Sequence, residues 1–272
     1  MQESSCLLYG VYHHRKNILM RLFFFLFILL TLAGPIFILM AGNIDFSADY
    51  RTAKRDSAHM APLPDKTAEA IIQVYSARTF NWRGLFAVHT WITFKPKDAK
   101  QFTVMHVIGW RLYMNKPPLM ITEDIPDRMW FDQIPTVILD IRGDKAAALI
   151  PKIREAANHY PYPNSYSYWP GPNSNTFTAH IGREVPELNL VLPSNAIGKD
   201  YLTNARFFAR MPSGTGYQFS LKGLFGIGLA KKEGVELNFL GLVYGIRLNP
   251  FGILLPGFGS IPKFGNQVPT SN

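Results

Sequence analysis

Residues Leu22–Ala41 read LFFFLFILLTLAGPIFILMA, a run of 20 residues that carries no charge. As a helix this run would rise about 30 Å, the thickness of the hydrocarbon core of a bilayer. Arg15, Lys16 and Arg21 directly precede it. This combination predicts a transmembrane anchor, and the organisation of the remaining chain follows from it.

A cleaved signal peptide is the alternative reading of the run. The apolar core of a signal peptide spans only about 7–15 residues and ends in a small-x-small site. Here the run is longer, and the pair Leu39/Ala41 makes a poor cleavage site. We therefore expect a short tail at 1–21 and an uncleaved anchor at 22–42.

Basic residues flank the run on both sides, so its orientation depends on their spacing. Three precede it directly, whereas Arg51, Lys54 and Arg55 begin ten residues beyond its end. Basic residues next to a span favour the cytoplasmic side. The tail is therefore expected in the cytoplasm and the following domain outside it.

The composition restricts the classes of partner. Lys and Arg outnumber Asp and Glu by 28 to 19, an excess that favours lipid head groups, acidic polymers or nucleic acid. The sequence has no basic block with interleaved aromatics and no nucleic-acid module, so anionic lipid is expected as a partner and nucleic acid is not. The single cysteine, Cys6, precedes the anchor and excludes an internal disulfide and a cysteine-based zinc site.

The chain beyond the anchor is predicted to form a stalk and then one α+β domain. Residues 43–66 are polar and end in Ala-Pro-Leu-Pro, which is typical of a linker. The domain, 67–272, is expected to be mainly antiparallel. Its expected strands are rich in β-branched and aromatic residues and cover 70–75, 86–94, 102–113 and 136–141.

Two helices are expected between these strands and the C-terminal part. The first runs from a capping Asp144 to about His159, with Pro151 kinking it. A loop rich in Pro, Tyr and Asn follows. The second helix is short, begins at Ser174 and stops before Pro186.

The C-terminal part alternates apolar residues with others around a turn at Lys231–Gly234, and glycines interrupt it. The alternating residues are Phe219, Leu221, Phe225, Ile227 and Leu229 before the turn, and Val235, Leu237 and Phe239 after it. This pattern predicts a long Gly-rich β-hairpin that extends the domain.

The segment Trp169–Phe177, WPGPNSNTF, is the most suggestive for chemistry. Two prolines and a glycine favour a tight turn, Asn173 is a good N-cap, and Ser174 then falls in the first helical turn. Free N–H groups and the positive end of the helix dipole would stabilise an anion there. The commoner alternative is a rigid loop with an ordinary cap.

His89 and His106 lie on neighbouring expected strands. A hairpin centred between Lys97 and Asp98 would make them direct cross-strand partners on one face of the sheet. The alternative for each is a half-buried, hydrogen-bonded histidine. Together with His180 they lack a metal-ligand spacing such as HExxH, so no metal and no cofactor is expected.

Five segments carry a family resemblance: FAVHTWITFKP at 86–96, WPGPNSNTF at 169–177, VPEL at 185–188, AIGKDY at 196–201 and PSGTGYQFSLKG at 212–223. They resemble an uncharacterised family of bacterial membrane-associated proteins, a domain of unknown function. The resemblance extends from about Ala70 to Gly259. It implies a bacterial membrane-associated protein and no activity. With the orientation expected from the basic residues, the domain would lie in the cell envelope, on the extracytoplasmic side of the inner membrane.

A second resemblance concerns residue order. Three features follow one another along the chain: a histidine on a strand, His89; a polar residue on the next strand, His106; and a helix that opens with Asn and has Phe four residues later, Asn173–Phe177. This order resembles the circularly permuted papain-like amidases and acyltransferases. The resemblance implies a papain-like domain in which Ser174 attacks, His89 is the general base and His106 orients it. The ligand-binding residues would be Asn173, Asn175, Trp169 and Trp91.

The chain departs from that family at the nucleophile, because Ser174 stands where the family has cysteine. A serine hydroxyl depends on a well-placed base with its own orienting group. Two readings follow: a serine-based amide or ester hydrolase or acyltransferase, or a papain-like shell that binds an envelope polymer, lipid or peptide without catalysis. A third class, an assembly or structural membrane factor, would use the basic surface and the hairpin. No oligomeric state follows from the sequence.

Overall fold

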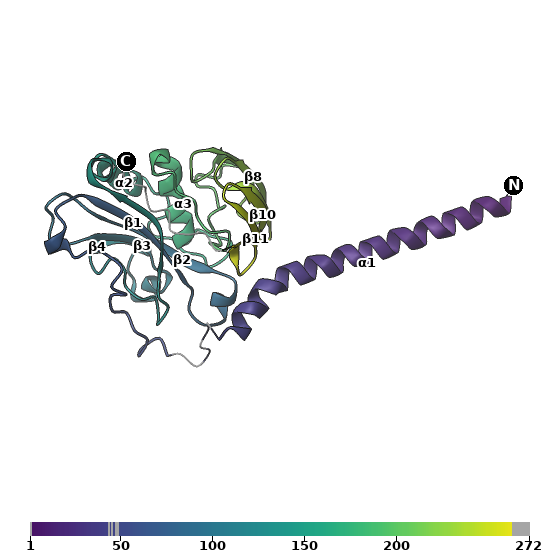
Figure 1. The fold of residues 1–272 in the computed structure, drawn as a ribbon, viewed down its shortest axis with the longest axis horizontal. Coiled ribbons are helices and arrows are strands. Elements are labelled where there is room, and N and C mark those ends of the chain that lie inside the picture. The colour runs from purple at the N-terminus through teal and green to yellow at the C-terminus, as the bar shows by residue number, and fades with distance from the viewer. Residues whose placement is uncertain (1, 43, 45, 47–48, 263–272) are drawn as a thin grey trace.

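The computed structural model describes residues 2–42, 44, 46 and 49–262, and for residues 2–14 the helix backbone alone. A long helix, α1 (Gln2–Met40), projects from a body that contains two antiparallel sheets (Figure 1). Within the described part, one helical stretch, Arg15–Met40, is long and apolar enough to cross a membrane, with a mean hydropathy of 2.7. The predicted α+β class and the N-terminal apolar helix are therefore confirmed.

The first sheet is antiparallel throughout, in the order β4-β3-β2-β1-β5. Its strands are β1 (Ile71–Arg78), β2 (Val88–Lys95), β3 (Thr103–Val107), β4 (Leu119–Glu123) and β5 (Thr136–Arg142). The helices of this half are α2 (Gly143–Asn158) and α3 (Ser174–Glu184), with short 3₁₀ helices η1 (Pro64–Lys66), η2 (Asn81–Leu85), η3 (Gly109–Met114) and η4 (Pro186–Leu188).

The side chains of this sheet alternate between two apolar clusters because successive strand residues point to opposite faces. On one face, Ile92 and Phe94 of β2 join the core that α2 and α3 cover, which includes Phe177 of α3. On the other face, Tyr75 and Trp91 form a smaller cluster with Val104, Val137 and Trp130. The central strands are buried on both faces, so the sheet separates two environments.

The second sheet is an antiparallel meander in the order β12-β11-β10-β9-β8-β7-β6. Its strands are β6 (Phe208–Arg210), β7 (Gly216–Leu221), β8 (Phe225–Ala230), β9 (Gly234–Phe239), β10 (Leu242–Leu248), β11 (Phe251–Leu255) and β12 (Gly259–Ile261). The predicted hairpin is present as β8 and β9, joined at Lys231–Gly234. It is part of a seven-stranded sheet rather than a separate extension.

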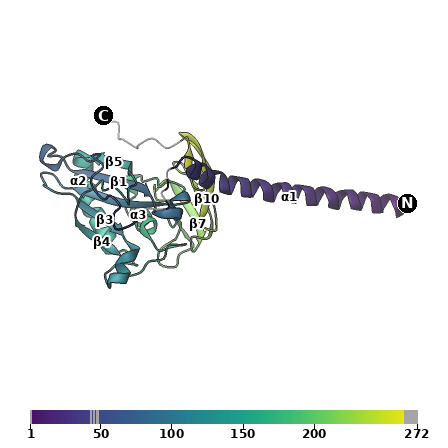
Figure 2. The ribbon, with the colours of Figure 1, turned by 90° about the horizontal axis from the view of Figure 1, so that it is seen from below.

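The C-terminal end of α1 packs on this second sheet, as Figures 1 and 2 show from two directions. Gly34 allows the approach, since a Cβ there would lie 1.9 Å from the carbonyl oxygen of Pro256. The next turn residue, Gly257, has a φ of +76°, and a Cβ on it would lie 2.8 Å from Pro35. The glycine and proline that interrupt the apolar run therefore form the contact between α1 and the body.

Several predicted elements need correction. The strand expected at 102–113 ends at Val107, and Gly109–Met114 is a 3₁₀ helix. The edge strand β4 was not predicted, because its residues have no apolar alternation. Asp144 is not the cap of α2: the N-cap position is Arg142, and Asp144 lies in the first turn. The helix itself runs through Pro151 as expected.

The segment predicted as a stalk packs against the domain instead of standing free. Asp127 is only 1% exposed and accepts hydrogen bonds from the hydroxyl of Ser57 at 2.8 Å and the N–H groups of Met60 and Ala61 at 2.6 and 3.0 Å. The N–H of Lys54 donates to the carboxylate of Asp132. The segment is therefore held to the body by the buried carboxylate of Asp127 and by Asp132 at the surface.

Replacing Asp127 by Ala should lower the free energy of unfolding by about 3 kcal/mol, because three donors lose a charged acceptor at a buried site. Denaturant unfolding of the full chain in detergent micelles measures the loss. The control is Glu187→Ala, which removes an ion pair with Lys152 whose side chains are about half exposed and should change stability little. Equal losses in the two variants would contradict the structural role given to Asp127.

Candidate functional site

The N-terminus of α3 confirms the predicted cap and shows that its N–H groups are occupied. The side-chain oxygen of Asn173 accepts hydrogen bonds from the N–H groups of Asn175 at 2.9 Å and Thr176 at 3.2 Å. In return, the N–H of Asn173 donates to the hydroxyl of Thr176 at 3.1 Å. This reciprocal capping box leaves neither of those first-turn N–H groups to hold an oxyanion.

The two asparagines at this position serve the fold rather than a ligand. The amide of Asn173 donates to the carbonyl oxygens of Tyr168 and Ile197. Asn175 accepts from the hydroxyl of Thr90 at 2.9 Å and donates to the carbonyl oxygens of Val88 and Ile197. Both side chains are buried and bonded to the protein, so the ligand-binding role expected for them is not what their contacts show.

Ser174 and His89 lie on opposite sides of the five-stranded sheet. Thr90 of β2 faces α3, as its bond to Asn175 shows. The adjacent residue, His89, points to the other face, where its ring stacks on Trp130 with centroids 3.8 Å apart. The nucleophile and its expected base therefore do not meet, and the papain-like arrangement expected for them is absent.

His89 and His106 do share a face, but not in the expected register. Ile92 pairs with Met105, which sets His106 opposite Trp91 rather than His89. The register is offset by two residues, so the two histidines are diagonal neighbours with ring centroids 5.8 Å apart. Strand adjacency and the common face are as predicted, and the direct pairing is wrong.

The surroundings of the two histidines keep both neutral. They are buried beside Trp91 and Trp130. Burial lowers the pKa of His89 well below its ordinary value, and burial lowers that of His106 to about 4. Within the described chain, neither ring nitrogen of His106 has a hydrogen-bond partner, so His106 does not orient His89. The described residues hold no cluster of metal-ligating side chains here or elsewhere.

The two tryptophans expected to bind a ligand also have structural partners. Trp91 is buried and its indole N–H donates to the carbonyl oxygen of Pro126 at 2.8 Å. Trp169 is half exposed and donates to the carbonyl oxygen of Leu240 at 2.9 Å. Trp169 therefore joins the loop before α3 to the second sheet, at the turn between β9 and β10.

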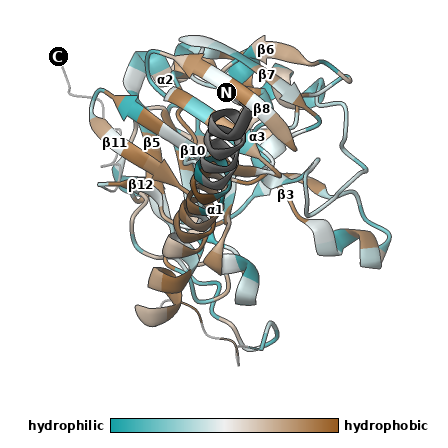
Figure 3. Cartoon of the chain, turned by 90° about the vertical axis from the view of Figure 1, so that its right-hand side faces the viewer, coloured by the Kyte–Doolittle hydropathy of each residue, from teal (hydrophilic) through white to brown (hydrophobic). Residues whose placement is uncertain are grey.

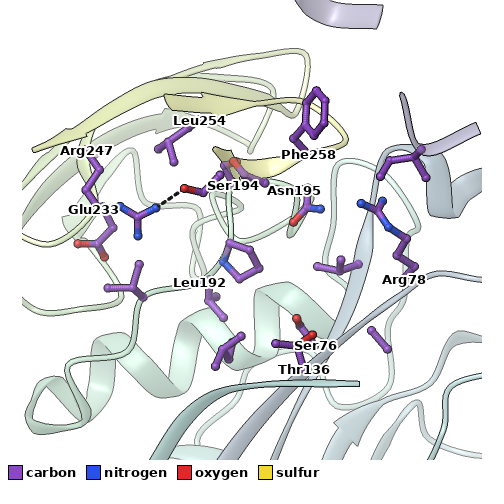
Figure 4. Close-up of a pocket in the computed structure, with 18 of the residues that line it drawn as sticks. Ser76, Arg78, Thr136, Leu192, Ser194, Asn195, Glu233, Arg247, Leu254 and Phe258 are labelled. Carbon is purple, nitrogen blue, oxygen red and sulfur yellow. Dashed lines mark hydrogen bonds between the residues drawn. The ribbon is translucent and has the colours of Figure 1, made fainter. Parts of the chain in front are cut away.

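A cavity of about 320 Å³ lies between the two sheets, at a place that the sequence did not indicate. Figure 4 shows its walls: Ser76 and Thr136 come from the first sheet, Glu233, Arg247 and Leu254 from the second, and Leu192, Ser194 and Asn195 from the loop after α3. Ile38 of α1 also lines it. The volume falls at the lower end of the range of small-molecule pockets, about 300–1,000 Å³.

Arg78 supplies a cation to the cavity wall. Its guanidinium donates to the carbonyl oxygens of Gly84 at 2.7 Å and Gly257 at 3.0 Å. Among the described residues it forms no ion pair, and burial lowers its pKa to about 10. The group is charged at neutral pH and has dipoles but no carboxylate beside it, which suits an anion.

The opposite wall carries charges that are already compensated. Arg247 donates to the hydroxyl of Ser260 at 2.9 Å and feels the carboxylates of Glu236 and Glu233. Glu233 accepts from the N–H and the hydroxyl of Ser213 at 3.0 and 2.6 Å. The cavity is therefore polarised, with unpaired positive charge on the side of the first sheet.

A further polar atom on the wall lacks a partner. The side-chain N–H of Asn195 donates to the carbonyl oxygen of Gly257, while its buried side-chain oxygen has no hydrogen-bond partner in the described chain. Because it is buried, this oxygen is closed off from the cavity itself. Leu192, Leu254 and Phe258 provide apolar surface next to it. The combined lining suits an amphiphile.

None of the residues expected to act chemically lines this cavity. The sequence contained one usable signal: polar residues alternate with the apolar ones in β9, where Glu236 and Asn238 lie between Val235, Leu237 and Phe239. Glu236 and Asn238 point inward, so the polar side of the second sheet is the side that faces the first sheet. Arg78 and Asn195 gave no sequence signal, because only the packing of the two sheets brings them together.

Below pH 6.5 the buried histidines should destabilise the fold. The pKa of folded His106 is about 4, so the unfolded chain binds the proton first, and the stability present above pH 6.5 is lost as the pH falls towards 4. The full effect is about 3 kcal/mol. Unfolding titrations at several pH values should show a shallower slope for His106→Asn than for the wild type. His159→Asn, at an exposed position, should keep the wild-type slope, and parallel slopes in all three would contradict the account.

Comparisons with known proteins bear on the first sheet and its helices. Residues 69–201 match the model of a family described as "Protein of unknown function (DUF3750)". No match is found among curated proteins or solved structures, and none supports the likeness to papain-like enzymes. The matched stretch ends at Tyr201, before the second sheet, so the cavity has walls from both parts. A DUF3750 domain, a domain of unknown function, covers residues 69–201 of this chain.

Proposed function

We propose that this protein is a membrane-anchored binding protein that holds an anionic amphiphile of the bilayer in the cavity between its two sheets. The observation that carries the proposal is Arg78, a partly buried cation on the cavity wall that forms no ion pair with described residues. A bound carboxylate or phosphate would supply the missing charge.

The position of α1 supports a ligand from the membrane. Ile38, near the end of α1, is 4% exposed and lines the cavity together with Phe258. The ring of Phe258 also contacts Phe37 of α1, with centroids 5.1 Å apart. An apolar tail at this wall would lie directly beside the helix that we place in the bilayer.

The proposal includes a location. Arg15 and Lys16 at the start of the apolar stretch favour a cytoplasmic tail, which puts the domain on the extracytoplasmic face of a bacterial inner membrane. There the domain would present or retain a lipid-class component of the cell envelope. The sequence left open a domain that binds without catalysis. The present proposal keeps that function but puts the ligand in the cavity between the sheets, and not beside Ser174.

A serine hydrolase or acyltransferase remains the competing proposal, and the geometry does not favour it. Ser174 would need a base on the α3 side of the sheet, whereas His89 lies on the other side. Two first-turn N–H groups that could stabilise an oxyanion, those of Asn175 and Thr176, are bonded to Asn173. A phosphonylating probe should therefore leave Ser174 unlabelled, and labelling that disappears in Ser174→Ala would favour the enzyme.

Native mass spectrometry of the full chain, purified in mild detergent from membranes, tests the binding proposal. We expect an anionic amphiphile bound at one per chain and lost in Arg78→Met, which keeps an unbranched apolar stem but removes the charge. Arg154→Met is the matched control, because Arg154 is exposed on α2 and lies over Phe94, away from the cavity. Ser174→Ala should also retain the ligand.

A second variant separates loss of binding from loss of fold. Ser76→Leu adds bulk from β1 into the cavity and leaves Arg78 in place. It should also lose the ligand, while circular dichroism shows an unchanged fold. Retention of the same anionic lipid by both Arg78→Met and Ser76→Leu would overturn the cavity as the binding site.

A further inference from the structure

The second sheet has its polarity reversed relative to that of an ordinary surface sheet. On β7, β8 and β9 the outward residues are apolar and the inward ones are polar or glycine. Leu229 is 57% exposed and Leu237 is 51% exposed, whereas Gln218 and Glu236 are 3% and 4% exposed. Soluble sheets with one solvated face show the opposite pattern.

Strand register joins the outward residues into continuous apolar rows. One row crosses six strands through the pairs Tyr217–Leu229, Leu229–Val235, Val235–Ile246, Ile246–Ile253 and Ile253–Ile261. With strands about 4.8 Å apart, the row is about 24 Å long. A second row contains Phe225 and Phe239, whose rings are 5.4 Å apart. An exposed apolar surface of this extent marks an interaction site.

The inner face holds the sheet in this orientation. Lys199 forms ion pairs with Asp200 at 3.1 Å and with Glu236, and all three are buried. Asn238 donates to Asp200 at 2.9 Å, and the hydroxyl of Ser220 donates to the carbonyl oxygen of Asp200 at 2.6 Å. Turning the sheet over would break this network, so the apolar residues stay outside.

The helix α1 shows what lies against the outer face. Phe27 of α1 contacts Phe239 with ring centroids 5.4 Å apart, and the hydroxyl of Thr31 is hydrogen-bonded to that of Tyr244 at 2.7 Å. Gly34 meets the backbone of the turn at Pro256. Phe27 and Gly34 are about 10 Å apart along the helix. At Phe27 the helix touches only the tip of a sheet side chain, whereas at Gly34 it touches backbone. The axis of α1 is therefore inclined away from the plane of the sheet.

Figures 1 and 3 agree with this geometry. In Figure 1, α1 leaves the body on the side of β8, β10 and β11, and Figure 3 looks along α1 onto the largely brown strands of the same sheet. A bilayer crossed by α1 therefore comes against the outer face. Phe27 also lies within the apolar run Leu22–Ala41, so the side-chain tips that it contacts are at hydrocarbon depth.

We infer that the outer face of the second sheet rests in the bilayer, with its apolar side chains among the acyl chains. The inference rests on the membrane anchoring by α1 that forms part of the proposed function. Strands of five to seven residues are too short to cross, since a spanning strand needs about 9–11. Lys222 and Lys231, exposed in the turns at the two ends of β8, would meet anionic head groups.

The test uses the full chain with Cys6→Ser and single cysteines that carry an environment-sensitive fluorophore. Two labels replace the outward residues Leu229 and Leu237. A third replaces Leu26, exposed on α1, and a fourth replaces Tyr113, which is 84% exposed in η3. Proteoliposomes of phosphatidylethanolamine and phosphatidylglycerol are examined with nitroxides on the acyl chains and, separately, with aqueous iodide.

We expect the labels at 229 and 237 to lose most of their fluorescence to acyl-chain nitroxides and little to iodide, like the label at 26. The label at 113 should respond to iodide alone. Iodide quenching at 229 and 237, with lipid quenching at 26, would overturn the inference and leave the anchor intact. Protection from both quenchers would mean that a second copy or another protein covers the face, which also overturns it. Iodide quenching at 26 would refute the anchoring itself.

Discussion

The buried ammonium group of Lys199 is the constraint on which the arrangement of this protein depends. A fully buried charge without a partner is very costly, and Asp200 and Glu236 face the ammonium group of Lys199. Burial alone would lower the pKa of Lys199, but the two carboxylates outweigh burial and raise it. Glu236 is in β9, and its inward direction sends the neighbouring residues Val235 and Leu237 outward. One buried ion pair thus decides which face of the second sheet is apolar.

The cavity and the apolar face both follow from that choice. Polar inward residues prevent the two sheets from closing on a continuous apolar core, and the space that remains is lined by Arg78, Arg247 and Glu233. The outward apolar residues in turn match α1, whose apolar length exceeds what the contact with the sheet covers. Ligand binding and lipid contact are thus two consequences of one sheet with reversed polarity.

Local sequence signals predicted the elements but not their assembly. The cap at Asn173, the strands β1, β2 and β5 of the first sheet and the turn at Lys231–Gly234 follow from residue types and spacing, and the structure confirms them. The partnership of Ser174 with His89 depended on which face of β2 meets α3. Thr90 points towards α3, so the adjacent His89 points to the opposite face, away from Ser174. Which of two adjacent strand residues faces the helix is determined by packing across the whole sheet, and short motifs do not encode that packing.

The central claim is that the outward apolar side chains of the second sheet contact acyl chains of the bilayer and not water. Solid-state NMR of the full chain in proteoliposomes tests it directly, by transfer of magnetisation to the methyl groups of Leu229 and Leu237 from acyl-chain protons or from water protons. The account predicts early transfer from the acyl chains and late transfer from water, as for Leu26 of α1. Early transfer from water to both leucines, with acyl-chain transfer confined to α1, would contradict it.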